Sequence, residues 1–322
     1  MNVVVIGLGS MGKRRIRLIR ELYPDIQVFG IDKRKDRCIE TVKKFAVQCF
    51  SDFNLVTFKV DCVFVCTSPL THNNIIREAL KHKTHVFTEL NLVDDGYIEN
   101  MKLAKAMKVK LFLSSTFLYR DEIKYIKEKV TDSKRWNYIY HIGQYLPNWH
   151  PWESYKDFFL GEKKTNGCRE ILAIELPWII SVFGNVVDYR SLSDKITTLD
   201  IDYDDNFMIQ LKHENGSKGC LVVDVVSPYA VRNLEIYSEH EYISWNGTPE
   251  SLLEYNKSLN KLNNVKLLEQ PEHIDGYETF IVENAYKNEI KAFFDAVLND
   301  KDCIYGFEKD KDTLSLIDIL GA

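Results

Sequence analysis

The stretch Val3-Val4-Val5-Ile6-Gly7-Leu8-Gly9-Ser10-Met11-Gly12 carries the strongest indication of the fold. Its four β-branched residues predict a strand buried on both faces, as the strands of a parallel sheet are. The glycines are typical of a strand-to-helix turn, because they permit a tight turn, close approach of a pyrophosphate and close packing of helix on strand. The helix start offers N–H groups to phosphates. The stretch therefore predicts a dinucleotide site formed by Gly7, Gly9, Ser10, Met11 and Gly12.

The end of the next apolar run bears on the choice of cofactor. Val28-Phe29-Gly30-Ile31 predicts a second strand, and Asp32 follows it, twenty residues after Gly12. A carboxylate in that position accepts hydrogen bonds from a ribose hydroxyl, which favours NAD. Lys33 and Arg34 come next and are able to hold a 2′-phosphate instead, so NADP remains open as the alternative.

Strands and helices continue to alternate up to about residue 115. Further strands are predicted at 63–66, 84–88 and 110–113, with helices near 72–81 and 94–107. This order indicates an α/β domain, a doubly wound parallel Rossmann sheet over residues 1–118. Alternating β patterns at 136–146 and 205–245, with helices near 168–183 and 280–298, then predict a second, α+β domain over residues 119–322 with a mostly antiparallel sheet.

Composition narrows the class of protein. The 322 residues suffice for two domains, and the 45% hydrophobic and 28% charged residues are typical of a globular protein. A net charge of −5 without a basic block argues against nucleic-acid or membrane partners. The start of the sequence lacks the pattern of a signal peptide, and no stretch is apolar enough to span a bilayer. Seven scattered cysteines without a CxxC pair predict free thiols in the cytoplasm and no metal site.

A polar segment follows the predicted strand at 63–66, where a parallel sheet presents its ligand loops. Thr67 and Ser68 are expected to border the nicotinamide ribose, and His72 either joins this site or only orients the helix that it begins. With the end of the next strand, the predicted cofactor contacts of this region are Thr67, Ser68, Pro69, His72 and Glu89.

Together these stretches resemble the Gfo/Idh/MocA family of oxidoreductases over nearly the whole chain. The resemblance implies hydride transfer between a nicotinamide and a sugar, a sugar derivative or a nucleotide sugar. It also implies a second domain built on a large open sheet. Because another subunit commonly covers that sheet in the family, we expect a homodimer or homotetramer. The stretch from Gly143 to Tyr155 resembles a branch linked to nine-carbon or amino sugars of bacterial surface glycans.

The sequence departs from the family at two chemically important positions. Where the family usually has Glu-Lys-Pro, with the lysine beside the reacting hydroxyl, this chain has Glu89-Leu90-Asn91. Where the family usually has a histidine on the helix of the second domain, alignment of the helix end puts Ile174. Oxidation of a carbinol requires a group that accepts the hydroxyl proton, and neither Leu90 nor Ile174 can do so.

Other side chains are therefore candidates for proton transfer. Glu170 and Glu175 lie on the predicted helix, and His150 lies in an aromatic-rich loop; a desolvated carboxylate or an imidazole suits base chemistry near neutral pH. Arg169 is expected to bind a carboxylate or phosphate of the substrate. The further candidates for substrate binding are Tyr119, Tyr145 and Trp149.

Three functions remain open from the sequence. The favoured one is an NAD(P)-dependent oxidoreductase on a sugar-type substrate in which another group has taken over proton transfer. The alternative is a dinucleotide-binding protein without redox turnover, a sensor or partner subunit. A third keeps NAD bound and recycles it within a non-redox reaction such as an elimination.

Overall fold

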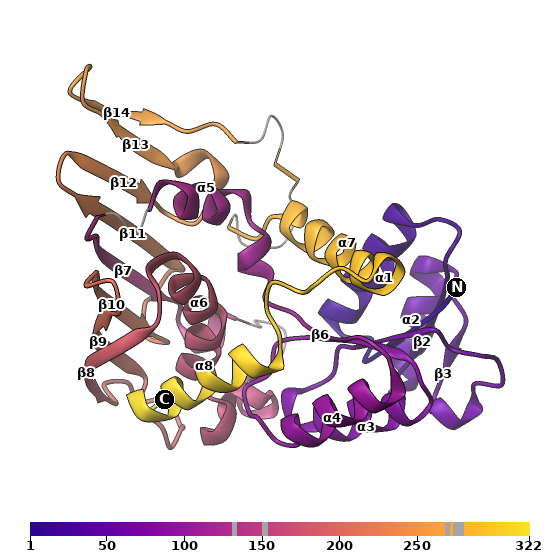
Figure 1. Cartoon of the computed structure of the whole chain (residues 1–322). Helices are drawn as coiled ribbons and strands as arrows, with labels where there is room; N and C mark the ends of the chain where they lie inside the picture. The colour runs from indigo at the N-terminus through magenta and orange to yellow at the C-terminus, as the bar shows by residue number, and fades with distance from the viewer. Residues whose placement is uncertain (131–133, 150–153, 268–270, 273–279) are drawn as a thin grey trace. The chain divides into compact units, whose positions relative to one another are not determined.

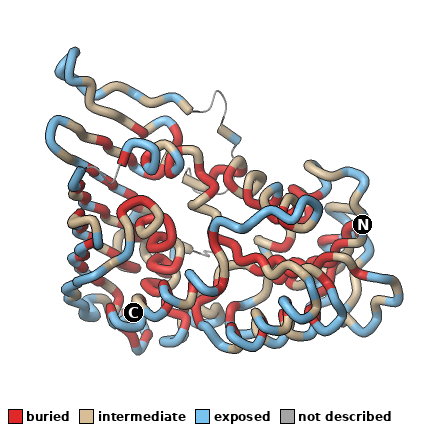
Figure 2. The backbone as a smooth tube through the Cα atoms, viewed as in Figure 1, coloured by how far each residue is buried: buried red, intermediate tan, exposed pale blue. Residues whose placement is uncertain are grey.

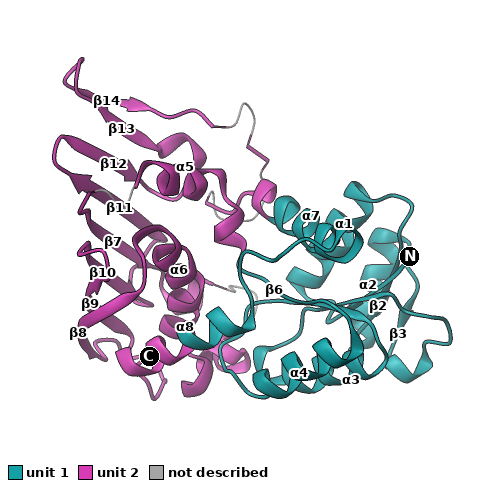
Figure 3. Cartoon of the chain, in the orientation of Figure 1, with its two compact units in different colours: residues 1–115, 286–312 teal, residues 116–285, 313–322 magenta. Residues whose placement is uncertain are grey.

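The computed structural model describes residues 1–130, 134–149, 154–267, 271–272 and 280–322. The chain divides into two compact units. The first unit contains residues 1–115 and 286–312, and the second contains residues 116–285 and 313–322 (Figure 3). His150 lies outside the described residues, so the structure says nothing about it.

The first unit is a six-stranded parallel sheet in the order β3-β2-β1-β4-β5-β6 (Figure 1). Its strands are β1 (Asn2–Ile6), β2 (Gln27–Ile31), β3 (Cys49–Phe50), β4 (Cys62–Val65), β5 (His85–Thr88) and β6 (Leu111–Leu113). Its helices are α1 (Ser10–Leu22), α2 (Lys35–Phe45), α3 (His72–Lys81), α4 (Tyr97–Met107) and most of α7 (Glu283–Asn299). The order reverses between β1 and β4, and such a switch point is where sheets of this kind bind nucleotides.

Burial explains the apolar runs of the first sheet. Val3, Val4 and Val5 of β1 and all four residues of β4 are buried, because helices cover both faces of the sheet (Figure 2). The predicted Rossmann fold is thereby confirmed.

Helix α7 joins the first unit although it comes after the second in the chain. The ring of Phe293 meets those of Phe64, Phe87 and Phe112 edge-on, with centroids 5.1, 5.6 and 5.7 Å apart. The unit therefore includes residues 286–312, whereas the sequence assigned everything after residue 118 to the second domain. The apolar face of α7 is complementary to the aromatic surface of the sheet, and periodicity alone does not reveal that partner.

The second unit is built on an eight-stranded sheet in the order β14-β13-β12-β11-β7-β10-β9-β8. Among the strand pairs of the described residues, only β7 and β10 are parallel, so the prediction of a mostly antiparallel sheet is confirmed. The strands are β7 (Asn137–Gly143), β8 (Val186–Asp194), β9 (Asn206–His213), β10 (Lys218–Asp224), β11 (Val231–Ser238), β12 (Glu241–Trp245), β13 (Leu253–Asn256) and β14 (Lys261–Asn264). The helices are α5 (Asp121–Lys129), α6 (Gly167–Phe183) and the end of α8 (Phe307–Leu320).

The two faces of the second sheet differ in composition. On one face, Tyr138 stacks on Phe183 of α6, and Tyr140 meets Trp178 of α6 edge-on. On the other face, Ile139 and Met208 are 46% and 60% exposed, so this face is open within the single chain. Of the helices that the structure describes, none combines the length and the apolar composition needed to cross a bilayer.

Candidate functional site

The glycine loop has the shape that a dinucleotide requires. Gly7 has φ +93°, and a Cβ atom on it would lie 2.5 Å from the carbonyl oxygen of Cys66. A Cβ on Gly12 would lie 1.9 Å from the carbonyl oxygen of Gly7, so the helix packs on the loop as closely as expected. A Cβ on Gly9, in contrast, would meet only Arg37 Nη1, at 3.7 Å, among the residues described. The backbone at Gly9 is therefore open to a ligand.

The start of α1 and Asp32 complete this cradle. Within the described structure, no side chain caps the start of α1, and its first turn contains no acidic residue. A helix start of this kind favours an anion such as a phosphate. The Asp32 carboxylate accepts hydrogen bonds from the backbone N–H groups of Leu8 and Arg34, both at 2.8 Å, and it is 9% exposed. These residues fit a bound NAD.

The basic residues near Asp32 differ in their exposure and in their ion-pair partners. Lys33 is exposed, and the Arg34 side chain forms an ion pair with Asp36 at 2.5 Å. Arg37, which the sequence did not single out, places Nη1 3.8 Å from Asp32 Oδ2. Its position in the first turn of α2 was the only available signal.

His72 links the loops that follow β4 and β5. It is 2% exposed, with Nε2 2.9 Å from the carbonyl oxygen of Thr67 and Nδ1 2.6 Å from Asn91 Oδ1. Burial lowers the pKa of His72, so the ring is neutral at physiological pH. Thr71 Oγ1 also donates to Thr67 Oγ1 at 2.8 Å. His72 thus orients the loop that carries Thr67, Ser68 and Pro69.

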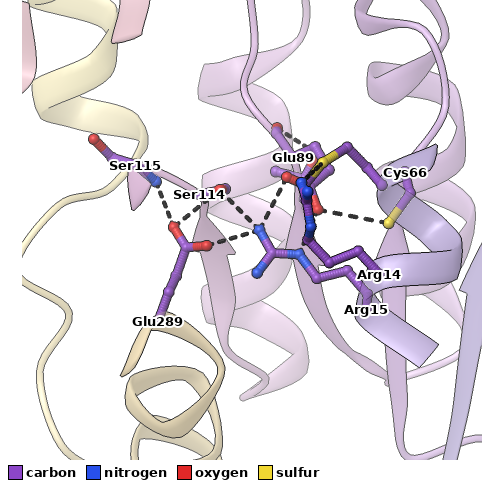
Figure 4. A network of polar contacts seen from close by, with 9 residues as sticks. Arg14, Arg15, Cys66, Glu89, Ser114, Ser115 and Glu289 are labelled. Carbon is purple, nitrogen blue, oxygen red and sulfur yellow. Dashed lines mark hydrogen bonds and ion pairs between the residues drawn. The ribbon is translucent and has the colours of Figure 1, made fainter. Parts of the chain in front are cut away.

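Glu89 belongs to a buried network that the sequence did not reveal. Arg15 binds both carboxylate oxygens of Glu89, at 2.6 and 3.0 Å, and Glu289 of α7 at 2.7 Å (Figure 4). Glu289 also accepts from Ser114 Oγ at 2.9 Å and from the N–H group of Ser115 at 2.8 Å. Cys66 Sγ lies 3.7 Å from Glu89 on the side opposite Glu289. The network joins α1, α7 and the ends of β4, β5 and β6.

In the second unit, one stripe of α6 contains Glu170 and Ile174. Most of this helix is buried, whereas Glu170 and Ile174 are partly exposed. Residues four apart lie on one face of a helix, so the carboxylate lies one turn from Ile174. Gly167 precedes Glu170 by three residues, and a Cβ on it would lie 3.8 Å from the ring of Trp149. Trp149 therefore lies beside the start of α6, one turn before Glu170.

The Glu170 carboxylate has one oxygen atom that no described hydrogen-bond donor reaches. Its Oε2 atom is buried and has no hydrogen-bond partner among the described residues. Burial raises the pKa of Glu170 from 4.5 to about 7. A carboxyl group that titrates near neutrality suits general acid–base catalysis.

Glu175 has a different environment from Glu170. It is fully buried, and its carboxylate accepts from Tyr140 Oη at 2.9 Å, from Trp178 Nε1 at 2.7 Å and from Arg232. Three donors satisfy this carboxylate within the core of the unit. Glu175 therefore belongs to the packed core of the unit, whereas Glu170 lies on the partly exposed stripe.

The other predicted substrate residues are spread over the second unit. Arg169 Nη1 lies 2.7 Å from Asp318 Oδ1 and 2.7 Å from the backbone oxygen of Ala322. Trp149 Nε1 donates to the carbonyl oxygen of Gln144 at 2.8 Å. The backbone N–H of Tyr145 donates to Ser227, and Tyr119 is buried at the end of a 3₁₀ turn (Thr116–Tyr119). The structure thus places Trp149 beside the start of α6 and engages Arg169 with residues 318–322.

Arg232 is the main residue that the sequence analysis missed in this unit. In Val231-Arg232-Asn233-Leu234-Glu235-Ile236, Arg232 shares the alternation of Leu234 and Ile236, which are buried. A charged residue at an inward position of a strand is unusual and was a usable signal.

Comparison with known proteins identifies relatives of part of the chain. Residues 1–111 match the model of the Gfo/Idh/MocA family, described as an oxidoreductase family with an NAD-binding Rossmann fold. Myo-inositol 2-dehydrogenase of Thermotoga maritima is 33% identical over 138 residues, which are 40% of this chain and 40% of that protein. The match thus spans about two fifths of the length of this curated relative.

Solved structures resemble the fold over the whole chain. UDP-N-acetylglucosamine 3-dehydrogenase of Acidithiobacillus ferrooxidans superposes with a TM-score of 0.78 at 15% identity, covering 99% of this chain and 96% of that one. Levoglucosan dehydrogenase in complex with NADH superposes with a TM-score of 0.79 at 15% identity, covering 99% and 95%. At these identities the likeness concerns the fold.

Proposed function

Because residues 1–111 of this chain match the model of the Gfo/Idh/MocA family of NAD-binding oxidoreductases, we propose that the protein is an NAD(P)-dependent dehydrogenase or reductase for a sugar, a sugar derivative or a nucleotide sugar. The names of its relatives, which include dehydrogenases of inositol, UDP-N-acetylglucosamine and levoglucosan, support a sugar-type substrate. The observation that carries the proposal is Glu170, a carboxyl group with a pKa of about 7 on the half-open stripe of α6.

The first unit holds the dinucleotide, which supplies a hydride acceptor or donor when bound. Gly7, Gly9 and Gly12 allow the pyrophosphate to approach the start of α1. Asp32 accepts from the adenosine ribose, so NAD is preferred over NADP. Thr67 and Glu89, at the ends of neighbouring strands, border the nicotinamide half.

Glu170 is the proton-transfer group of the second unit. In the oxidative direction, the ionised carboxylate accepts the proton of the substrate hydroxyl while a hydride leaves the carbon that bears this hydroxyl. In the reductive direction, the protonated carboxyl group returns it. Ile174 supplies an apolar neighbour that keeps the carboxylate desolvated, which holds its pKa near the working pH. Glu170 thus replaces the lysine and histidine of the family pattern.

The experiment that tests this assignment is single-turnover hydride transfer in Glu170→Gln, followed at 340 nm with a panel of sugars and nucleotide sugars. We expect the rate to fall by roughly 10²–10⁴-fold, because a positioned base contributes about that factor, while NADH binding followed by fluorescence is unchanged. Glu162→Gln, an exposed carboxylate on the preceding segment, is the matched control and should keep the parental rate.

Two outcomes contradict the proposal. If Glu170→Gln retains the parental rate, the base is another group. If the parent binds NADH but no sugar or nucleotide sugar changes the absorbance at 340 nm, the protein is a dinucleotide-binding protein without redox turnover.

We also propose that two copies of the chain associate through the open face of the second sheet. The strand register sets Leu192 beside Met208, and Met208 beside Val222, in one row across this face. Leu192 is 76% exposed and Met208 60% in the single chain. A second copy presents the same surface, so a two-fold contact buries both rows at once. Sedimentation velocity distinguishes such a dimer, or a tetramer built from it, from a monomer.

A further inference from the structure

Arg232 has an inward position on β11 of the second unit. It lies opposite Ile142 in the strand register, on the face of the sheet that α6 covers. Its side chain is held from several directions and is only 8% exposed. The guanidinium carbon lies 4.5 Å from the ring centroid of Phe117 and 5.0 Å from that of Phe280. A Cβ on Gly247 would lie 2.7 Å from Arg232 Cδ, so the absence of a side chain there makes room for the arginine.

Of the three nitrogen atoms of this guanidinium, only Nη1 forms hydrogen bonds with described residues. Nη1 donates to Tyr140 Oη at 2.9 Å and to the Glu175 carboxylate. Nε is buried without a hydrogen-bond partner, and Nη2 likewise makes no hydrogen bond to any residue that the structure describes. The Nε–Nη2 edge is the side of arginine that binds a carboxylate through two parallel hydrogen bonds.

Two other buried arginines of this chain show how that edge is normally used. Arg15 binds Glu89 through Nε at 2.6 Å and Nη2 at 3.0 Å. Arg120, whose guanidinium also lies near the ring of Phe117, binds Glu122 through Nε at 3.1 Å and Nη2 at 3.0 Å. In both cases a carboxylate of the chain fills the edge. At Arg232 the chain provides no such carboxylate among its described residues.

We infer that the Nε–Nη2 edge of Arg232 binds a carboxylate of the substrate, so that the preferred substrate is a sugar acid. This inference rests on the proposed function and deepens it. Both groups belong to the second unit, and Glu175, which anchors Arg232, lies on α6 as Glu170 does.

A planar carboxylate fits this edge better than a single acceptor atom. The guanidinium cannot rotate to follow a ligand, because Tyr140 and Glu175 hold Nη1 and aromatic rings lie against the group. Two coplanar oxygens match two parallel N–H groups. A neutral hydroxyl leaves one of these N–H groups unsatisfied, which disfavours the neutral sugar.

The test measures binding of small probes to the full-length protein by calorimetry. The probes are sodium acetate, sodium D-glucuronate and D-glucose, with sodium chloride at matched ionic strength as the reference. We expect the parent to bind the two carboxylates more tightly than glucose. Arg232→Lys keeps the positive charge beside Glu175 but loses the two parallel N–H donors of the Nε–Nη2 edge. It should weaken carboxylate binding by roughly 10- to 100-fold. Arg15→Lys is the matched control, because it changes a buried arginine of the first unit whose edge Glu89 already fills, and it should bind the probes like the parent.

The outcomes separate this inference from the proposed function. Glu170→Gln should slow hydride transfer yet bind acetate and glucuronate like the parent. A parent that binds these carboxylates but shows no turnover with any sugar overturns the redox assignment alone. Equal carboxylate binding by the parent and Arg232→Lys, or no carboxylate binding by the parent, overturns the role of Arg232. Should Arg232→Lys fail to fold, the pair Arg232→Met with Glu175→Gln removes both buried charges, and the same loss of carboxylate binding is expected.

Discussion

Replacement of Glu170 by glutamine should stabilise the protein while it abolishes activity. Burial raises the pKa of Glu170 from 4.5 to about 7 in the folded state, so the folded chain holds this proton more tightly than the unfolded chain. The stabilisation from that proton is fully present below about pH 4.5 and is lost as the pH rises through 7. Over about 2.5 pKa units at 1.36 kcal/mol each, the ionised carboxylate costs the folded state about 3 kcal/mol at pH 8 and about 1 kcal/mol at pH 5. A glutamine carries no such cost.

Urea denaturation at pH 5 and pH 8 measures this difference. We expect the free energy of unfolding of Glu170→Gln to exceed that of the parent by about 3 kcal/mol at pH 8 and by about 1 kcal/mol at pH 5. Glu175→Gln is the contrasting control, because it leaves Arg232 buried without its carboxylate and should destabilise the protein by about 3–5 kcal/mol at both pH values.

The rate of hydride transfer should follow the same ionisation. In the oxidative direction the rate should rise tenfold per pH unit below about pH 7 and level off above it, because only the ionised carboxylate accepts a proton. Glu170→Gln should lose this limb of the profile. A stability difference that is equal at pH 5 and pH 8, or a variant that keeps both the rate and the limb, would refute the reasoning.

Four further variants test the other parts of the structure. Asp32→Ala should erode a preference for NAD(H) over NADP(H) in calorimetric titration, and tighter NADP(H) binding by the parent would contradict the assignment. Arg15→Met leaves two carboxylates without their buried cation and should lower the free energy of unfolding by about 3–5 kcal/mol in urea; a loss below about 1 kcal/mol would show that the network is dispensable. Leu90→Lys with Ile174→His, introduced into the variant without the base, should restore part of the 340 nm rate, and no recovery would mean that these positions do not face the reacting carbon. Leu192→Glu puts a charge on the open sheet face and should shift sedimentation toward the monomer, whereas a parent that is already monomeric would disprove the dimer.

Local signals were sufficient for the fold of the first unit. The apolar run before Gly7 became β1, and the helix expected at 72–81 is α3 with the same bounds. Such elements are specified by neighbouring residues, since burial on both faces and turn chemistry are written within a few positions. Helix α7 is different: its amphipathic pattern predicts a packing helix but not the sheet against which Phe293 packs.

The roles of charged residues depend on partners that are remote in sequence. Glu170 and Glu175 are equivalent as sequence candidates, yet Glu175 meets Tyr140, Trp178 and Arg232, whereas Glu170 Oε2 meets no donor among the described residues. Arg169 is expected at the substrate from its neighbours in the chain, but its guanidinium binds Asp318. Whether a buried polar side chain finds hydrogen-bond partners is decided by the folded structure. The sequence therefore identified the candidates, and the structure ranks them.

The position of α7 has a consequence for how the chain is synthesised. The sheet of the first unit leaves the ribosome early, but its covering helix follows only after residues 116–285 have been made. At a synthesis rate of about 5–20 residues per second, this interval lasts roughly 10–30 seconds, during which Phe64, Phe87 and Phe112 lack the ring of Phe293. We therefore expect the nascent first domain to expose an aromatic surface until α7 has been made, and a stop codon after residue 118 would leave that surface uncovered permanently.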